Sequence, residues 1–121
     1  MQHILVSGAR DWSDKKLVYD TLIKFKDQNV TLIHGGCDGL DKIAGEVATE
    51  LGFTVQVFLP DWTKYRRAGG PIRNRQMIME LLKHKDKHMF AFHDDIEKSK
   101  GTKDCVSQAK KLGINAIVIK H

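Results

Sequence analysis

Short apolar runs alternate with amphipathic segments along the whole chain. Five runs that are rich in β-branched and aromatic residues predict strands at His3–Ser7, Val30–His34, Thr54–Leu59, His88–Phe92 and Ala116–Ile119. Because each run is almost continuously apolar, we expect strands that are buried on both faces. Strands of this kind are typical of a parallel sheet.

The segments between these runs repeat their apolar residues with helical spacing. The clearest stripe consists of Leu40, Ile43, Ala44, Val47, Ala48 and Leu51, and it predicts a helix with Asp38 as its N-cap and Gly52 just beyond its end. Three more helices are indicated by Leu17, Val18, Thr21, Leu22 and Phe25, by Ile78, Leu81 and Leu82, and by Val106, Ala109 and Leu112. Pro71 suits the first turn of the third helix. Thr102 is expected to cap the fourth helix, which stops at Gly113.

This order of elements predicts an α/β fold. Right-handed crossovers turn it into a three-layer Rossmann-like fold, in which a five-stranded, mostly parallel sheet carries helices on both faces. With 121 residues, the chain is expected to form a single domain over residues 1–121. Ligands of open α/β sheets bind beyond the carboxyl ends of the strands, where the strand order reverses. The corners at that edge are Ser7–Trp12, His34–Asp41, Leu59–Arg75 and His93–Thr102, and the third includes the long connection Pro60–Gly70.

Composition narrows the class of protein. The chain is 41% hydrophobic and 29% charged, which is ordinary for a soluble globular domain. No apolar run approaches the roughly 18 residues of a membrane span, and the first residues lack a signal-peptide pattern, so we expect no membrane partner. The net charge of +5 favours anionic partners such as nucleotides or nucleic acid.

The two cysteines, Cys37 and Cys105, form no CxxC pair and no zinc-ligand pattern. We therefore expect no metal site and a reducing, cytoplasmic setting. Cys105 is expected to pack within a helix. Cys37 is expected to fill space in its corner, with a reactive thiol as the alternative.

The corner His34–Asp41 has the features of a ligand-binding turn. Its glycines let the backbone approach a ligand, and a helix start presents unpaired N–H groups to a phosphate. We therefore expect Gly35, Gly36 and Gly39 to contact phosphate or ribose, with simple turn formation as the alternative. Asp41 is expected either to complement the helix dipole or to bind a ribose hydroxyl. Neither a P-loop motif nor a G-x-G-x-x-G fingerprint is present.

A series of short motifs carries a family resemblance. The motifs are Ser7-Gly8-Ala9-Arg10-Asp11-Trp12, Gly35-Gly36-Cys37-Asp38-Gly39-Leu40-Asp41, Asp61-Trp62, Ala68-Gly69, Arg73-Asn74-Arg75-Gln76-Met77 and Gly101-Thr102-Lys103-Asp104. They resemble, in order, the G-[SG]-R-x-[WF], G-G-A-x-G-A-D, D-W, A-G, R-N-x-x-M and G-T-x-D elements of the SLOG superfamily, specifically its small YspA/YpsA-related branch. That superfamily also includes the DNA-processing protein DprA and the cytokinin-activating LOG phosphoribohydrolases.

The resemblance implies a nucleotide-type ligand, such as ADP-ribose or an NAD-like molecule, and a homo-oligomer. No other cofactor is implied. The expected ligand-binding residues are Gly8, Arg10, Trp12, Gly35, Gly36, Gly39, Asp41, Trp62, Arg73, Asn74, Gly101 and Thr102.

The residue types at these positions suit such a ligand. Arg73 and Asn74 are expected in the first turn of a helix, where a cation is electrostatically disfavoured, and this favours a ligand role. An arginine can grip a phosphate through two hydrogen bonds. Arg10 is similar, with a surface ion pair as the alternative. Trp12 and Trp62 either stack on a base or line the pocket or core.

Departures from the LOG pattern favour binding over catalysis. The LOG enzymes carry P-G-G-x-G-T-x-x-E with a catalytic Glu, whereas Cys105 stands at that place here, one residue after Asp104. Asn74 also replaces the Lys of the LOG R-K-x-x-M motif. The first hypothesis is therefore a nucleotide-derivative binding module that senses or sequesters its ligand.

Two alternatives remain open. The first is a hydrolase that cleaves an N-glycosidic or phosphate bond. Its candidate catalytic residues are Asp38, Asp41, Asp94, Asp104 and Arg73. The second is DprA-like binding of single-stranded nucleic acid through the basic-aromatic segment Lys64-Tyr65-Arg66-Arg67. We rank it lower because the net charge is modest.

Overall fold

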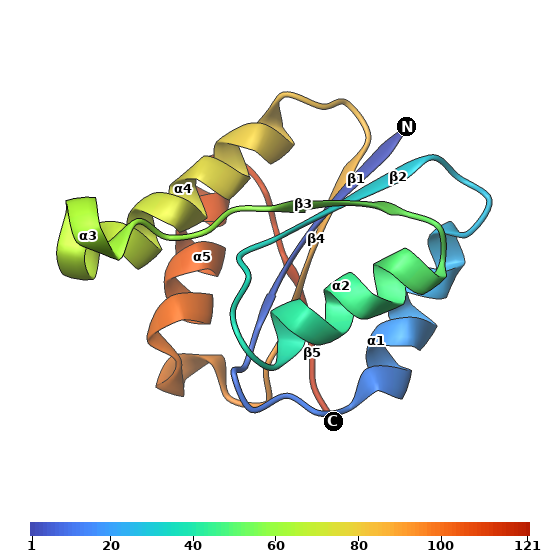
Figure 1. Ribbon diagram of the computed structural model, residues 1–121, viewed down its shortest axis with the longest axis horizontal. Coiled ribbons are helices and arrows are strands. Elements are labelled where there is room, and N and C mark those ends of the chain that lie inside the picture. Colours follow the sequence, from blue (N-terminus) through green and yellow to red (C-terminus); the bar gives the residue numbers. More distant parts are fainter.

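A five-stranded, fully parallel sheet runs through the middle of the molecule (Figure 1). The computed structural model describes residues 1–121. The strands are β1 (Gln2–Gly8), β2 (Val30–His34), β3 (Thr54–Val57), β4 (Lys87–Phe92) and β5 (Ile117–Ile119), arranged in the order β3-β2-β1-β4-β5. This arrangement confirms the predicted Rossmann-like sheet. The strand order reverses beside β1, because β2 pairs on one side of it and β4 on the other.

Helices cover both faces of the sheet. α1 (Lys15–Leu22), which continues as the 3₁₀ turn η1 (Ile23–Phe25), packs beside α2 (Leu40–Glu50) on one face. α4 (Gly69–Leu82) and α5 (Lys100–Lys111) pack together on the other face. The expected long connection contains the short helix α3 (Trp62–Tyr65) and the 3₁₀ turn η2 (Arg66–Ala68), and a further 3₁₀ turn, η3 (Ile96–Lys98), precedes α5. α3 projects from one end of the molecule (Figure 1). None of the helices has the length and hydrophobicity that crossing a membrane requires.

Alternate residues of β1 enter two separate hydrophobic cores. Ile4 and Val6 belong to the core under α1 and α2, whereas Leu5 belongs to the core under α4 and α5. All three side chains are fully buried. Successive side chains of a strand point to opposite faces, so the continuous apolar run of β1 fills both layers. Full burial of such a side chain stabilises the fold by roughly 1.5–3 kcal/mol.

The expectation that every strand is buried on both faces holds for the three central strands and is wrong for the edges. The edge strand β3 exposes Val57, and the other edge strand, β5, exposes Ile117 and Val118. Each edge strand has only one hydrogen-bonded neighbour in the sheet. An apolar run alone does not distinguish an edge strand from a central one.

The helices begin at residues other than those predicted. Gly39 is the N-cap of α2, and Asp38 instead forms an ion pair with Lys42 across 2.6 Å. Ser99 is the N-cap of α5: its Oγ accepts a hydrogen bond from the Thr102 N–H at 3.1 Å, so Thr102 lies inside the first turn.

α4 also begins earlier than its apolar stripe indicates. Its first residue is Gly69, which places Pro71 in the first turn as predicted and Arg73 in the second turn. The predicted electrostatic penalty at a first turn therefore does not apply to Arg73. Asn74 follows it in the same turn.

A pair of histidines lies at the amino end of the sheet. The rings of His3 and His84 stack with their centroids 3.4 Å apart and an angle of 4° between their planes. His3 is 6% exposed, and its Nδ1 has no hydrogen-bond partner. Burial lowers the pKa of His3 below its ordinary value of 6.5, and the neighbouring His84 lowers it further.

This pair predicts a loss of stability in mild acid. Because the pKa of His3 is lower in the folded protein than in the unfolded chain, the unfolded chain binds the proton more readily. The free energy of unfolding should therefore fall as the pH drops below about 6.5. Urea unfolding at about pH 7.5 and about pH 5.5 measures this loss, which we expect to be smaller for His3→Phe than for the wild type. An equal loss in both proteins would assign the pH dependence to other groups.

Candidate ligand-binding site

A cavity of about 510 Å³ opens at the carboxyl ends of β1 and β4, where the strand order reverses. Its lining residues are Ser7, Gly8, Ala9, Arg10, Asp11, Cys37, Asp41, Arg73, Asn74, Met77, His93, Ser99, Lys100, Gly101 and Thr102. Only three of these fifteen residues are hydrophobic, so the cavity suits a polar ligand. Among the predicted ligand-binding residues, the cavity brings together Gly8, Arg10, Asp41, Arg73, Asn74, Gly101 and Thr102. The volume is in the usual range for ligand pockets, about 300–1,000 Å³.

A second hollow, of about 580 Å³, lies beside the first; we refer to it as the Trp62 groove. Its lining residues are Arg10, Gly35, Gly36, Cys37, Asp38, Leu59, Pro60 and Trp62. Arg10 and Cys37 line both hollows. The predicted ligand-binding residues are thus divided between two adjoining hollows: besides Arg10, three of them (Gly35, Gly36 and Trp62) line the groove.

The amides of the glycine corner are engaged within the protein. Asp41 Oδ2 accepts hydrogen bonds from the N–H groups of Gly35 at 3.1 Å and Cys37 at 3.2 Å. The Gly36 N–H donates to His34 Nδ1 at 2.9 Å. These three donors already have partners, so the corner as folded does not present them to a phosphate. The Asp41 carboxylate instead holds the corner against the start of α2.

Asp41 lies in an unusual environment for a carboxylate. It is 6% exposed. Burial raises the pKa of Asp41 above its ordinary value, although the two backbone donors and the Arg73 guanidinium act in the opposite direction. Its Oδ2 accepts both backbone hydrogen bonds in a largely water-free setting, where hydrogen bonds are strong.

Gly39 joins the start of α2 to the first corner. Its φ of +75° is in a region that other residues rarely adopt, and a β-carbon at this position would overlap the Arg10 carbonyl. The next residue, Leu40, donates its N–H to the Ala9 carbonyl at 3.1 Å. Gly39 lines neither hollow. Gly39 thus lies where the backbone at the start of α2 closely approaches the backbone of the first corner.

Arg73 is the buried cation of the cavity wall. It is 7% exposed, and its Nη1 donates to the Gly35 carbonyl at 2.6 Å while its Nε donates to Asn74 Oδ1 at 3.0 Å. Its Nη2 lies 3.8 Å from Cys37 Sγ. No carboxylate oxygen lies within the 4.0 Å of an ion pair, so the guanidinium has no direct counter-ion.

Gly35 makes room for this arrangement. A β-carbon on Gly35 would lie only 2.5 Å from Arg73 Nη1. A side chain at this position would therefore displace the guanidinium from the wall. The absence of a side chain at Gly35 therefore leaves room for the guanidinium in the wall.

Asn74 links α4 to α5 beneath the cavity. Its Nδ2 donates to the Gly101 carbonyl at 3.3 Å and to Asp104 Oδ2 at 3.0 Å. The same Asp104 oxygen accepts a hydrogen bond from Gln108 Nε2 at 2.8 Å. Asp104 does not line the cavity, and its carboxylate joins the two helices.

The start of α5 presents free donors to the cavity. The N–H groups of Lys100 and Gly101 have no acceptor within the protein. No acidic side chain occupies the first turn of α5. Thr102 is 3% exposed, and its hydroxyl has no protein partner. The positive end of a helix of this length, together with free N–H groups, favours an anion.

The cavity also contains residues that were absent from the predicted set. These are Ser7, Ala9, Asp11, Cys37, Met77, His93, Ser99 and Lys100. Most of them belong to the corners that the sequence placed at the carboxyl ends of strands, so position in the fold was the available signal. His93 Nδ1 accepts the Asp95 N–H at 3.0 Å, and the neutral ring therefore carries its proton on Nε2, as a donor.

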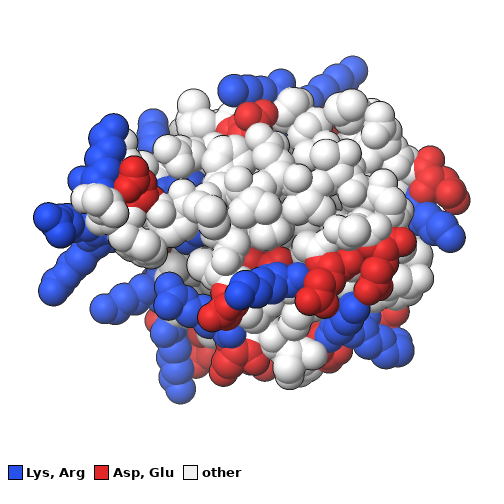
Figure 2. Space-filling view, viewed as in Figure 1, with Lys and Arg blue, Asp and Glu red and all other residues white.

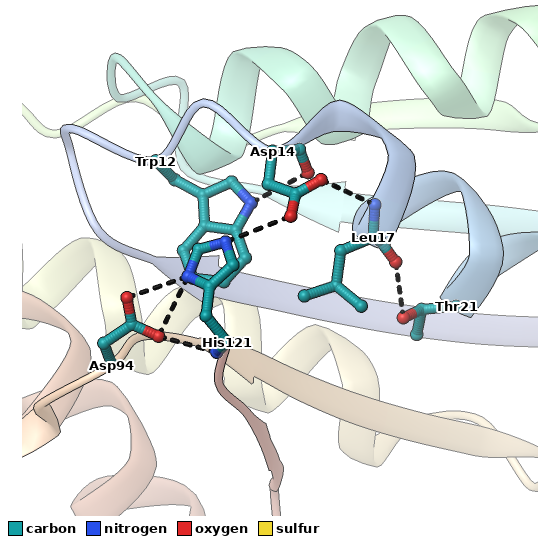
Figure 3. Close-up of polar contacts among 6 residues, drawn as sticks. All are labelled: Trp12, Asp14, Leu17, Thr21, Asp94 and His121. Carbon is teal, nitrogen blue, oxygen red and sulfur yellow. Dashed lines mark hydrogen bonds and ion pairs between the residues drawn. The ribbon is translucent and has the colours of Figure 1, made fainter.

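Trp12 belongs to the hydrophobic core and lines neither hollow. Its indole is 5% exposed and stacks on His121 with ring centroids 4.5 Å apart. Its Nε1 donates to the Asp14 carbonyl at 3.1 Å. In Figure 3 the His121 ring lies between Asp14 and Asp94, 3.1 Å and 2.8 Å from their carboxylates. The hydrogen bond to Asp94 is the main cause that raises the pKa of His121.

The other candidate acids are placed away from the cavity. Asp94 is paired with His121, and Asp38 is an exposed residue of the Trp62 groove. Cys105, at the place of the LOG glutamate, is fully buried, and burial raises the pKa of its thiol to about 12. Among the four aspartates proposed as catalytic, only Asp41 lines the cavity. No three His, Cys, Asp or Glu side chains converge as a metal-ligand set.

A basic cluster lies outside both hollows, at the projecting end of the molecule. It consists of the exposed side chains Lys64, Arg66 and Arg67. Figure 2 shows Lys and Arg side chains gathered at the end that carries α3. Lys64 Nζ lies 5.1 Å from the centre of the Tyr65 ring.

Comparisons with known proteins agree with this architecture. A family model described as "YspA, cpYpsA-related SLOG family" matches residues 2–65. The chain is 30% identical over 125 residues to the Gene 61 protein of Mycobacterium phage D29, covering 97% of this chain and 95% of that protein. It also superimposes on the crystal structure of TM1055, a structural genomics target, with a TM-score of 0.69 and 18% identity, covering 96% of this chain and 72% of that chain. The last similarity shows a common fold.

Proposed function

Because this chain belongs to the YspA, cpYpsA-related SLOG family, we propose that its cavity binds a phosphate-bearing nucleotide or nucleotide derivative, of which ADP-ribose and NAD are examples. Family membership indicates nucleotide-related ligand binding or processing. The proposal is that the chain senses or sequesters this ligand. The observation that carries it is the start of α5, which faces a polar cavity with unpaired donors.

The start of α5 is the proposed phosphate site. The N–H groups of Lys100 and Gly101 are free, the Thr102 hydroxyl is unpaired, and the Lys100 side chain adds a positive charge. The start of α2 differs, because Asp41 already occupies the donors of its corner. A phosphate therefore gains more hydrogen bonds and less repulsion at α5 than at α2.

Arginines strengthen the preference for an anionic ligand. Arg73 places a buried guanidinium without a direct counter-ion in the wall, and Arg10 adds a second, exposed cation at the rim. Burying a charge without a partner is costly. A bound phosphate would offset part of that cost.

Binding without cleavage agrees best with the placement of the acids. Glycosidic cleavage passes through an oxocarbenium-like state that a carboxylate facing the sugar stabilises. Asp41 is the proposed catalytic acid that lines the cavity, and one of its oxygens already accepts two backbone N–H groups. If the hydrolase alternative is correct, Asp41→Asn should abolish product formation from ADP-ribose.

The exposed basic cluster Lys64, Arg66 and Arg67 supports the nucleic-acid alternative, which we place second to nucleotide binding. Binding of a nucleic-acid backbone should weaken steeply with salt. A gel-shift assay that finds no complex at low salt would remove this alternative. The homo-oligomer that the resemblance implies stays a prediction.

Thr102→Val should separate ligand binding from folding. The change keeps the shape of the side chain and removes a hydroxyl that has no protein partner, so the free energy of unfolding should change by less than about 0.5 kcal/mol. Loss of one hydrogen bond to phosphate should weaken binding about tenfold. Titration calorimetry with ADP-ribose, NAD, cyclic ADP-ribose and common nucleotides measures the affinities.

Thr21→Val is the matched control for this variant. Thr21 is also buried, but its hydroxyl donates to the Leu17 carbonyl at 2.8 Å and it lies outside the cavity. Its substitution should leave affinity unchanged. The proposal fails if the wild type binds none of these ligands at millimolar concentration.

A further inference from the structure

We propose that the Trp62 groove is the base-binding subsite of a two-part ligand whose halves are joined by a pyrophosphate. This inference rests on the proposed function, because it requires a sugar-phosphate end in the main cavity. The ligand class is then a nucleoside diphosphate linked to a second sugar or nucleoside. One half would lie in the cavity, the linker at Arg10 and the aromatic base against Trp62.

The two hollows adjoin each other. Arg10 and Cys37 line both, so a ligand that occupies both hollows would cross beside these two residues. Arg10 is exposed, and its guanidinium is not held in an ion pair. A linking pyrophosphate at this position would meet a cation able to donate two parallel hydrogen bonds.

The two hollows differ in chemistry in a way that sets the orientation of the ligand. The main cavity is polar and has the free donors of α5, which suit a sugar phosphate. The groove has the aromatic and apolar surfaces of Trp62, Leu59 and Pro60, which suit a planar base. Asp38, which also lines the groove and is paired with Lys42, would accept hydrogen bonds from ribose hydroxyls or an exocyclic amine.

Trp62 is held in position for stacking before any ligand arrives. Its side chain is 50% exposed, so a large part of the indole is available to a ligand. The indole lies against the first turn of α4, where a β-carbon on Gly69 would be 2.9 Å from Trp62 Cε3. Gly69 and Gly70 are the first two residues of α4. Their absence of side chains makes room for the ring.

The test compares two probes, ADP-ribose and ribose 5-phosphate, by titration calorimetry. For the wild type we expect ADP-ribose to bind more tightly than ribose 5-phosphate. Trp62→Ala should weaken ADP-ribose binding about tenfold to a hundredfold and leave ribose 5-phosphate binding unchanged. Trp62→Phe should restore most of the loss. Because the side chain is half exposed, both variants should fold, which circular dichroism checks.

A second pair of variants tests the position of the indole while Trp62 itself is kept. Gly69→Ala places a β-carbon 2.9 Å from Trp62 Cε3 and should reduce affinity for ADP-ribose. Gly70→Ala is the matched control, because its β-carbon would lie 3.4 Å from Trp62 Cη2, an ordinary contact. It should leave affinity unchanged.

The outcomes separate this inference from the proposed function. If ribose 5-phosphate binds and Trp62→Ala leaves ADP-ribose affinity unchanged, the subsite is wrong while the proposed function stands. Equal weakening of both probes would also overturn the subsite, because it would indicate an indirect effect through α4. An effect of Trp62→Ala on a single-stranded oligonucleotide alone would assign the groove to nucleic acid. If neither probe binds the wild type, the subsite proposal fails; the proposed function fails as well only if NAD, cyclic ADP-ribose and common nucleotides also do not bind at millimolar concentration.

Discussion

Replacing Arg73 with alanine is expected to lower the free energy of unfolding by about 3 kcal/mol and to weaken nucleotide binding about tenfold to a hundredfold. The guanidinium donates to the Gly35 carbonyl at 2.6 Å and to Asn74 Oδ1 at 3.0 Å. Both acceptors are buried and would be left without this donor. The same change removes the buried positive charge of the cavity wall, on which the proposed phosphate site depends.

Two further variants give this prediction its controls. Arg73→Lys keeps the charge and loses the planar fork, so it should recover part of the binding and less of the stability. Arg75→Ala removes an exposed arginine of the same helix and should change the free energy of unfolding by no more than about 0.5 kcal/mol. Urea unfolding and titration calorimetry supply the two measurements. An Arg73→Ala protein with wild-type stability and affinity would contradict the role of this side chain in the wall.

Gly39→Ala should cost more than about 3 kcal/mol of stability or prevent folding altogether. Gly39 has φ +75° and ψ −120°, a conformation that costs other residues about 1–3 kcal/mol. Its β-carbon would also overlap the Arg10 carbonyl, which is backbone and cannot rotate away. The first corner and the start of α2 would have to move apart.

Gly52→Ala isolates the first of these effects, the backbone strain. Gly52 also has a positive φ, +78°, but a β-carbon there would meet nothing within 4 Å. Its cost should be limited to backbone strain, about 1–2 kcal/mol. Thermal unfolding of Gly39→Ala and Gly52→Ala measures the two losses of stability. Equal losses for the two glycines would show that the contact between Gly39 and Arg10 contributes nothing.

The fold was predictable because its signals are local and repeated. Apolar runs, amphipathic stripes and turn residues alternate in the sequence, and only a few arrangements of parallel strands satisfy that order. The corners at the carboxyl edge followed directly from this topology. For this reason, most of the predicted polar residues do meet in one cavity, with Arg10, Arg73 and Thr102 drawn from three different corners.

Helix starts were harder to predict because several residues compete for each cap. Ser99 and Thr102 are both good caps, and only the folded backbone decides that Ser99 Oγ accepts the hydrogen bond. The sequence likewise indicated Asp38 as the cap of α2, whereas the cap is Gly39. The contact of Gly39 with the first corner, which requires a glycine, is not visible in the local pattern.

The glycine corner shows most clearly what the sequence could not reveal. Its amides looked available for phosphate, but Asp41 accepts two of them from six and four residues away in sequence. The burial of Trp12 could not be predicted from the sequence either. Its indole packs against Phe92 and His121, which are far from it along the chain. Tertiary partners decide whether a polar or aromatic residue faces a ligand.

The central claim is that a nucleotide binds at the start of α5. An NMR titration with ADP-ribose, in which assigned amide resonances are followed, tests it most directly. We expect the resonances of Lys100, Gly101 and Thr102 to shift and to saturate together. Those of Gly52 and Gly113, which precede β3 and β5 at the opposite edge of the sheet, should stay in place. Shifts confined to the basic cluster around α3, or none at millimolar ligand, would contradict a nucleotide site at the start of α5.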